Sequence, residues 1–251
     1  MNQEPRIDII AAALADRARA RIVTALMDGR AYSAKELAFR AEVTPQTASF
    51  HLQRLTGTGL LADYRRGRHR YFYIGDADMA GAVEALMAAA PQDHLRSLPP
   101  RARGAFVLAR SCWTHLAGKL AVALAERLAE MDAIAFRGGS FLPGPQAAAL
   151  FHRLGLPSDT VAEPAAARLQ PGSSPCWAKP CLDWTERRFH LAGRLGRSLL
   201  EHFLAQGWLV RLPEGRALAA TPSGIAAFRD LLGIDVEALE SAVAVERQAA
   251  E

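Results

Sequence analysis

The side chains best suited to bind metal ions or to react in this chain of 251 residues are three cysteines and two of its seven histidines. Cys112 and His115 are three positions apart, a spacing that would place them on one face of a helix. Cys176 and Cys181 enclose a proline-containing segment, and His190 follows it. Thiolates and imidazoles are ligands for soft and borderline metal ions. The candidate ligand or metal residues are Cys112, Trp113, His115, Cys176, Cys181, Trp184 and His190.

These residues leave several interpretations open. They could hold a metal or metalloid ion, Cys176 and Cys181 could oxidise as a redox switch, or the thiols could simply fill buried space. An enzyme with Cys112 as nucleophile and His115 as base is another alternative, but no orienting Asp or Asn and no oxyanion motif accompany them, so the sequence favours a non-enzyme. A further alternative is an organic ligand in an aromatic pocket lined by Trp113, Trp177, Trp184 and Phe189.

A second set of residues, in the N-terminal third of the chain, could contact DNA. Thr44-Pro45 is a helix-start signal, a capping residue followed by proline, and the helix that it opens extends to Leu55. Its polar side chains suit base edges, and the cationic residues 65–70 between two strand-prone runs can reach phosphates or a minor groove. The predicted DNA-binding residues are Thr44, Gln46, Thr47, Ser49, Phe50, His51, Gln53, Arg54, Arg65, Arg66, Arg68, His69 and Arg70.

The surrounding sequence supplies the elements that would position these groups. Asp16 could cap a helix, and Ser33 with Glu36 forms a capping box. Apolar residues recur at helical spacing and then at the two-residue period of strands. Expected helices cover residues 7–14, 17–27, 34–40, 44–55 and 76–90, and expected strands cover 60–64 and 71–74. This order of helices followed by a hairpin is a winged helix-turn-helix.

Residues 7–90 resemble the ArsR/SmtB-type bacterial regulators in four blocks: ADRARARI at 15–22, SAKELA at 33–38, VTPQTASFHL at 43–52 and GRHRYF at 67–72. The resemblance implies a homodimer that binds a near-palindromic DNA operator, with half-sites about one helical turn apart. It also implies that the first and last helices of the winged unit form the dimer interface, through Ile7, Ile10, Leu14, Met79, Val83, Leu86 and Met87.

The metal sites found in many members of that family are absent from this sequence. The helix before the turn has no cysteine in residues 36–40, and the helix over residues 76–90 has no histidine. A signal would therefore have to enter through the longer C-terminal region. The cofactor stays open, with a thiolate-bound metal or metalloid as one possibility.

Charge and composition divide the chain in two. Residues 1–74 carry 12 basic and 7 acidic side chains, a net charge of +5, whereas residues 75–251 carry 18 and 19, a net charge of −1. The basic part suits nucleic acid as a partner. No membrane span, signal peptide or disulfide framework is evident, so we expect a cytoplasmic protein. We predict a DNA-binding and dimerisation domain over residues 1–92 and an effector domain over residues 93–251.

The predicted effector domain contains an internal repeat. The sequence HLAGKL at 115–120 recurs as HLAGRL at 190–195, 75 residues later. We interpret the Ala-Gly pair in each copy as a place where two helices approach closely. The repeat predicts two winged-helix-like halves, about 104–157 and 176–236, in one pseudo-symmetric domain. The expected fold class is mainly α with small β-hairpins (α+β).

These features predict a sequence-specific DNA-binding transcriptional regulator. We expect a homodimeric repressor that is released by a ligand, a metal or metalloid ion, or an oxidant sensed in the C-terminal domain. The alternatives are a cysteine-dependent enzyme or metal-binding protein that uses Cys112 and His115, and an architectural protein that binds DNA without sequence preference.

Overall fold

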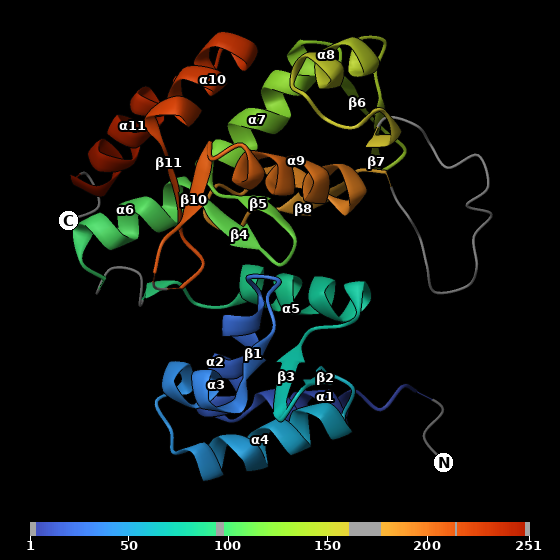
Figure 1. Cartoon of the computed structure of the whole chain (residues 1–251), viewed down its shortest axis with the longest axis vertical. Helices are drawn as coiled ribbons and strands as arrows, with labels where there is room; N and C mark the ends of the chain where they lie inside the picture. Colours follow the sequence, from blue (N-terminus) through green and yellow to red (C-terminus); the bar gives the residue numbers. More distant parts are fainter. Residues whose placement is uncertain (1–3, 94–97, 161–176, 214, 249–251) are drawn as a thin grey trace. The chain divides into compact units, whose positions relative to one another are not determined.

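The computed structural model describes residues 4–93, 98–160, 177–213 and 215–248 (Figure 1). The chain divides into two compact units: unit 1 ends at Leu86, and unit 2 begins at Met87. Helices predominate in both, with small antiparallel sheets, so the predicted fold class is confirmed. Within the described ranges, no helix is long and apolar enough to cross a lipid bilayer.

Unit 1 has the element order of a winged helix-turn-helix. The Thr44 side chain accepts a hydrogen bond from the Thr47 amide at 3.2 Å, and Pro45 is the first residue of α4. Ser33 and Glu36 form the predicted capping box of α3. The elements are α1 (Ile7–Leu14), α2 (Arg17–Leu26), β1 (Tyr32–Ser33), α3 (Ala34–Ala41), α4 (Pro45–Gly57), β2 (Ala62–Arg66), β3 (His69–Tyr73) and α5 (Ala77–Ala89), within which the division between the units falls.

The wing is the antiparallel hairpin of β2 and β3, in a sheet with the strand order β1-β3-β2. Arg66 pairs with His69, so only Gly67 and Arg68 form the turn. Residues 65–70 were expected to lie between the two strands, but Arg65 and Arg66 belong to β2, and His69 and Arg70 belong to β3. A two-residue turn suffices here because Gly67 adopts a φ of 60° without steric cost.

A buried carboxylate connects the end of α2 with the sheet. Asp28 accepts hydrogen bonds from the Tyr32 hydroxyl and from the Arg30 amide, the latter at 2.9 Å. Burial and the hydrogen bond to Asp28 raise the pKa of Tyr32 to about 12, so its hydroxyl remains a donor. Because Tyr32 pairs with Phe72 of β3, this contact fixes the wing relative to α2.

Unit 2 is built from β-hairpins and helices in alternation (Figure 1, green to red). Its elements after α5 are α6 (Pro100–Leu108), β4 (Arg110–Cys112), β5 (His115–Ala117), α7 (Lys119–Glu130), β6 (Ile134–Arg137), β7 (Ser140–Pro143), α8 (Ala147–Arg153), the 3-10 turn η2 (Ser158–Thr160), β8 (Lys179–Leu182), β9 (Phe189–Ala192), α9 (Gly193–Ala205), β10 (Leu209–Arg211), β11 (Leu218–Ala220), α10 (Pro222–Leu232) and α11 (Val236–Gln248).

The internal repeat corresponds to the order hairpin, helix, hairpin, helix, which occurs twice. The repeated HLAG sequences lie at the junction of strand and helix, so the interpretation of their Ala-Gly pairs as helix–helix contacts was wrong. Gly118 has a φ of 95° and Gly193 a φ of 76°. A side chain on Gly118 would lie 2.6 Å from the carbonyl oxygen of Val107. Glycine is therefore needed for a backbone conformation and a close backbone approach.

In unit 2 the first hairpin of each half packs against a helix of the other half, around one apolar core. The β4–β5 hairpin of the first half packs against α9 of the second, and the β8–β9 hairpin packs against α7. Figure 1 shows α9 beside β5. Leu120 of α7 and Leu195 of α9, equivalent in the repeat, are both fully buried in this core. This packing brings the two HLAG strands, β5 and β9, next to each other.

Candidate DNA interface and candidate metal centre

The outer face of α4 presents polar side chains to solvent. Gln46, Thr47, Gln53 and Arg54 are exposed, as is Phe50. The opposite face is buried in the core of unit 1, through Ala48, Leu52 and Leu55. The N-terminal turns of α4 therefore offer hydrogen-bonding groups in the arrangement by which a recognition helix reads base edges.

Four of the predicted DNA contacts on α4 have other partners, and one of them is Thr47, whose hydroxyl lies 2.9 Å from the Thr44 hydroxyl. His51 is only 7% exposed, and its Nδ1 atom lies 3.4 Å from the Arg19 guanidinium. We therefore remove His51 from the DNA contacts; its helical spacing from Ala48, Leu52 and Leu55 could have placed it on the inner face. The Ser49 hydroxyl donates to the Pro45 carbonyl oxygen, and the Thr44 hydroxyl caps the helix, although both residues are exposed.

The side chains of four predicted DNA-binding residues of the wing are exposed to solvent: Arg65, Arg66, Arg68 and His69. Arg70 is also exposed, but it makes two hydrogen bonds to the Asp63 carboxylate, at 2.6 and 2.7 Å. That pairing neutralises its charge locally, so we expect Arg70 to contribute less to DNA binding than its neighbours.

The predicted dimer residues divide into exposed and covered ones. Ile7 and Leu86 are 78% and 55% exposed, and Ile9, which was not among the predicted residues, is also exposed. Ile10, Leu14, Met79 and Met87 are half-buried. Val83 is only 5% exposed within the single chain, so we remove it from the predicted interface.

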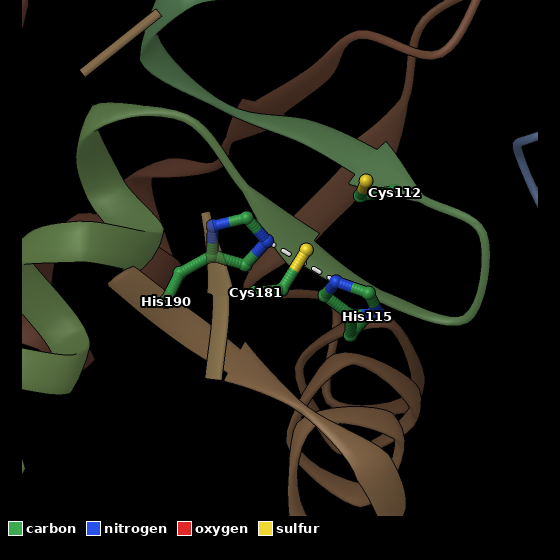
Figure 2. Close-up of side chains that lie close together, drawn as sticks. All are labelled: Cys112, His115, Cys181 and His190. Atoms are coloured by element: carbon green, nitrogen blue, oxygen red, sulfur yellow. Dashed lines mark hydrogen bonds between the residues drawn. The ribbon is translucent and has the colours of Figure 1, made fainter. Parts of the chain in front are cut away.

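Four of the predicted ligand residues meet between the two halves of unit 2, and we call Cys112, His115, Cys181 and His190 the Cys–His cluster (Figure 2). Their donor atoms all lie within 4.8 Å of one another. Cys112 is the cross-strand partner of His115, and Cys181 is the cross-strand partner of His190. The Nε2 atoms of the two histidines are 3.1 Å apart. Each hairpin thus supplies one thiol and one imidazole.

The local structure around Cys112 and His115 differs from the predicted helix. The two residues lie on paired strands, and Trp113 and Thr114 form the turn between them. Trp113 adopts a φ of 54°, an unusual conformation for a bulky side chain. The residues are neighbours as predicted, but through cross-strand pairing instead of helical spacing.

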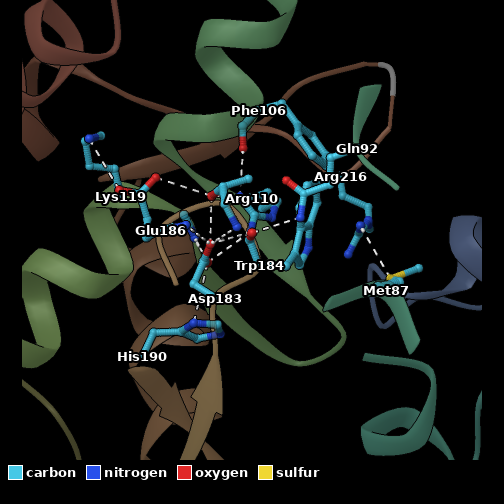
Figure 3. Close-up of polar contacts among 12 residues, drawn as sticks. Met87, Gln92, Phe106, Arg110, Lys119, Asp183, Trp184, Glu186, His190 and Arg216 are labelled. Carbon is cyan, nitrogen blue, oxygen red and sulfur yellow. Dashed lines mark hydrogen bonds and ion pairs between the residues drawn. The ribbon is translucent and has the colours of Figure 1, made fainter. Parts of the chain in front are cut away.

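A buried ion pair supports the cluster from one side (Figure 3). The Arg110 guanidinium donates to both oxygens of Asp183, at 2.8 and 2.9 Å, and neither side chain is exposed. Asp183 also accepts from the Gly118 amide at 2.7 Å, and its Oδ2 atom lies 3.5 Å from His190 Nδ1. Arg110 and Asp183 carry no recognisable sequence signal, because their pairing depends on contacts between distant segments.

The same surroundings set the charge states of the site. Burial would raise the pKa of the Asp183 carboxyl, but Arg110 and His190, with hydrogen bonds from Thr185 and Gly118, hold it well below its usual range. Burial lowers the pKa of His190 to about 4, which the attraction of Asp183 only partly offsets. Asp183 is therefore ionised and His190 neutral near pH 7.

The remaining candidates of unit 2 have separate surroundings. Trp184 stacks on Arg110, 4.5 Å from the guanidinium to the ring centre, and Trp113 lies beneath Arg197. The Trp177 indole donates to the Thr160 carbonyl oxygen, and Phe189 stacks on Phe136. These contacts give no support to one aromatic pocket lined by all four predicted side chains. Cys176 lies outside the described residues.

Comparison with known proteins identifies the class. Residues 14–63, from the end of α1 into β2, match the family described as a helix-turn-helix domain. Over 233 residues the chain is 36% identical to a Bacillus subtilis (strain 168) protein described as the uncharacterized HTH-type transcriptional regulator YdfF, and the match covers 92% of this chain and 99% of that protein. The protein is thus a DNA-binding transcriptional regulator of the winged helix-turn-helix class. The chain belongs to the family of HTH-type regulators that includes YdfF, and a match of this length extends through most of unit 2.

Several solved structures resemble unit 1 only. Reduced HlyU from Vibrio cholerae N16961 is 23% identical, covering 34% of this chain and 90% of its own, with a TM-score of 0.31. CMTR from Mycobacterium tuberculosis, described as a cadmium metal-sensor, is 35% identical. The match covers 32% of this chain and 81% of CMTR, with a TM-score of 0.28. A third structure is the homodimeric winged helix-turn-helix domain of Mb0332 from Mycobacterium bovis, described as a possible ArsR-family regulator. It is 27% identical, and the match covers 36% of this chain and 88% of that domain, with a TM-score of 0.31. At these TM-scores, no site is transferred from them.

Proposed function

We propose that this regulator is a homodimeric, sequence-specific repressor in which unit 1 reads the operator and unit 2 carries the response to an effector. The observation that carries the first part is the exposed polar face of α4 beside a cationic wing. Both lie in the part of the chain that holds its net positive charge. A helix that reads bases and a wing that binds phosphates would supply specificity and affinity separately.

Base readout is assigned to the first turns of α4. The Gln46 amide can bond an adenine bidentately, and the Thr47 methyl group can contact a thymine methyl group. The Thr44 cap and the partial positive charge of the helix N-terminus suit a phosphate. Arg66 and Arg68, at the tip of the wing, have the reach to bind phosphates or enter the minor groove.

Dimerisation is assigned to α1 and α5. Ile7, Ile9 and Leu86 are large apolar side chains left exposed by the single chain, and burial of such side chains favours association by about 25 cal/mol per Å². A two-fold dimer presents two copies of α4 to DNA, which requires a near-palindromic operator.

Release is assigned to unit 2. An effector can weaken DNA binding only if it binds more tightly to the DNA-incompetent state, and coupling of this kind is worth about 1–3 kcal/mol in typical systems. The Cys112–His115 pair faces a second pair, Cys181 and His190, and this favours a ligand-binding role over nucleophilic catalysis, because coordination uses all four donors at once.

A gel-shift titration on the DNA upstream of the protein's own gene tests the operator proposal. We expect a retarded band that survives excess unrelated DNA. Gln46→Ala and Thr47→Ala should reduce the preference for the operator over unrelated DNA, each by about 1–3 kcal/mol. Arg68→Ala should weaken binding to both DNAs and lower the slope of log K against log salt by about one.

Arg137→Ala is the matched control, since Arg137 is an exposed arginine in the β6–β7 hairpin of unit 2. It should leave both the affinity and the salt slope unchanged. Equal binding to operator and unrelated DNA would refute sequence-specific recognition and favour an architectural role. Unchanged specificity in both helix variants would refute the assignment of α4 as the reading element.

A further inference from the structure

We propose that the Cys–His cluster is a tetrahedral binding site for one divalent thiophilic metal ion with the preferences of Zn²⁺. Two thiolates and two imidazoles form the donor set that zinc prefers in closed four-coordinate sites. The donors come from two hairpins, β4–β5 and β8–β9, that belong to different halves of the repeat. Figure 2 shows the histidine rings and the Cys181 sulfur gathered around one common volume.

The spacing of the donors is close to what such an ion requires. With metal–ligand distances of about 2.0–2.3 Å, a tetrahedron places two nitrogens about 3.3 Å apart and two sulfurs about 3.8 Å apart. The Nε2 atoms of His115 and His190 are already 3.1 Å apart, and no donor pair exceeds 4.8 Å. Closing the widest pair around an ion thus needs a movement of about 1 Å. Small side-chain rotations can supply it.

The surroundings orient one of the imidazoles for coordination. Asp183 Oδ2 lies on the Nδ1 side of His190, at 3.5 Å, and so favours the tautomer whose Nε2 lone pair faces the cluster. A carboxylate behind a ligating histidine is the usual outer partner of zinc sites. Asp183 is itself fixed by Arg110 and the Gly118 amide, which makes it a positioning residue for the ligand.

Charge balance favours a divalent ion with two thiolates. On binding, the two thiols release one proton each to solvent, and the ion gains two thiolates and two neutral imidazoles. The hydrogen between the two Nε2 atoms moves to Nδ1 of its own ring. The site as a whole remains neutral, which matters because Cys112, His115 and His190 are buried and an unbalanced charge there would be costly. Cys181 is partly exposed and gives the ion a route of entry.

A Co²⁺ and Zn²⁺ titration of the full-length protein tests the site. The protein is reduced with a phosphine, stripped with a chelator and then titrated anaerobically. We expect one Co²⁺ per chain, with visible bands of tetrahedral cobalt and thiolate-to-metal charge transfer, and full displacement by one equivalent of Zn²⁺. Zn²⁺ should also raise the urea midpoint of unit 2, because the ion binds only the folded state. Tryptophan fluorescence follows this unit alone, since Trp113, Trp177, Trp184 and Trp208 all lie in it.

Variants locate the ion. Cys181→Ser changes the most accessible ligand and should weaken Zn²⁺ binding more than about 100-fold, beyond the effect of losing an outer partner. Two controls, His152→Gln at an exposed histidine and Cys176→Ser, should keep one tight ion per chain. If Cys181→Ser does not fold, the wild-type cobalt spectrum decides the matter, because a spectrum without thiolate charge transfer refutes the site. Tight binding that survives Cys181→Ser, or that is lost in Cys176→Ser, also refutes it.

The metal site does not depend on DNA binding, but an effector role for the ion rests on the proposed function. A gel shift of the stripped protein with and without one equivalent of Zn²⁺ separates the two. A change in operator affinity of about 5-fold or more supports the effector role. Unchanged affinity with stoichiometric binding overturns that role and leaves the metal site standing.

Discussion

The guanidinium of Arg110 balances a carboxylate that has no access to water, so its removal should be among the most damaging single changes in unit 2. Both side chains of the Arg110–Asp183 pair are fully buried. Removing one partner of such a pair costs about 3–5 kcal/mol, because the other charge stays buried. Asp183 would keep the Gly118 amide and the Thr185 amide and hydroxyl as donors. We therefore expect the lower end of this range, about 3 kcal/mol, for Arg110→Met.

A double-mutant cycle separates the charge effect from lost packing. Arg110 also stacks on Trp184 and lies near the ring of Phe106, and methionine replaces only part of those contacts. In the Arg110→Met/Asp183→Asn double variant neither charge of this pair is left in the core. Its loss should be smaller than the sum of the two single losses by about 1–3 kcal/mol.

Urea unfolding followed by tryptophan fluorescence measures these free energies for unit 2. Arg188→Met is the matched control, because Arg188 pairs with Glu126 but is 62% exposed. We expect it to cost less than about 1 kcal/mol. Losses for Arg110→Met that match this control, or single losses that simply add in the double variant, would show that the reasoning about buried charge is wrong.

Three further changes probe other parts of the fold. Gly118→Ala should destabilise unit 2 by more than about 3 kcal/mol, because backbone strain adds to a 2.6 Å contact between the new Cβ atom and a carbonyl oxygen. Gly138 has a φ of 58° and no atom near the position of a Cβ, so Gly138→Ala should cost only about 1–2 kcal/mol in the same urea assay. Thr44→Ala should lower the stability of unit 1 by about 1 kcal/mol through loss of the cap, measured by circular dichroism. A loss of stability below about 0.3 kcal/mol would contradict a capping role. Ile7→Asp with Leu86→Asp should give monomers by sedimentation velocity, and a persistent dimer would place the interface elsewhere.

Local signals were sufficient for most of unit 1. The Thr44-Pro45 start, the Ser33–Glu36 capping box and the glycine-containing cationic hairpin each depend on neighbours in sequence, and each is present as expected. His51 was misplaced because its polarity was given more weight than its position on the inner face of α4. The lesson is that helical spacing outweighs residue type in placing a side chain.

Unit 2 was harder because its decisive contacts join distant segments. The apolar HLAG run is compatible with a helix, and the Trp113-Thr114 turn lacks the glycine that would have indicated a hairpin. The repeat at an offset of 75 does relate His115 to His190. It does not relate Cys112 to Cys181, because the first hairpin turns over two residues and the second over residues 183–188. A fixed offset therefore hides the equivalence of the thiols.

The division of the Cys–His cluster between two hairpins has a consequence for effective concentration. Either half alone offers only one sulfur and one nitrogen, so separate halves would have to meet in solution before four donors could surround an ion. Covalent fusion of the halves in one chain makes that encounter intramolecular. Completion of the donor set then does not vary with the amount of protein in the cell, so at a given pH the occupancy of the proposed site follows the concentration of the ion.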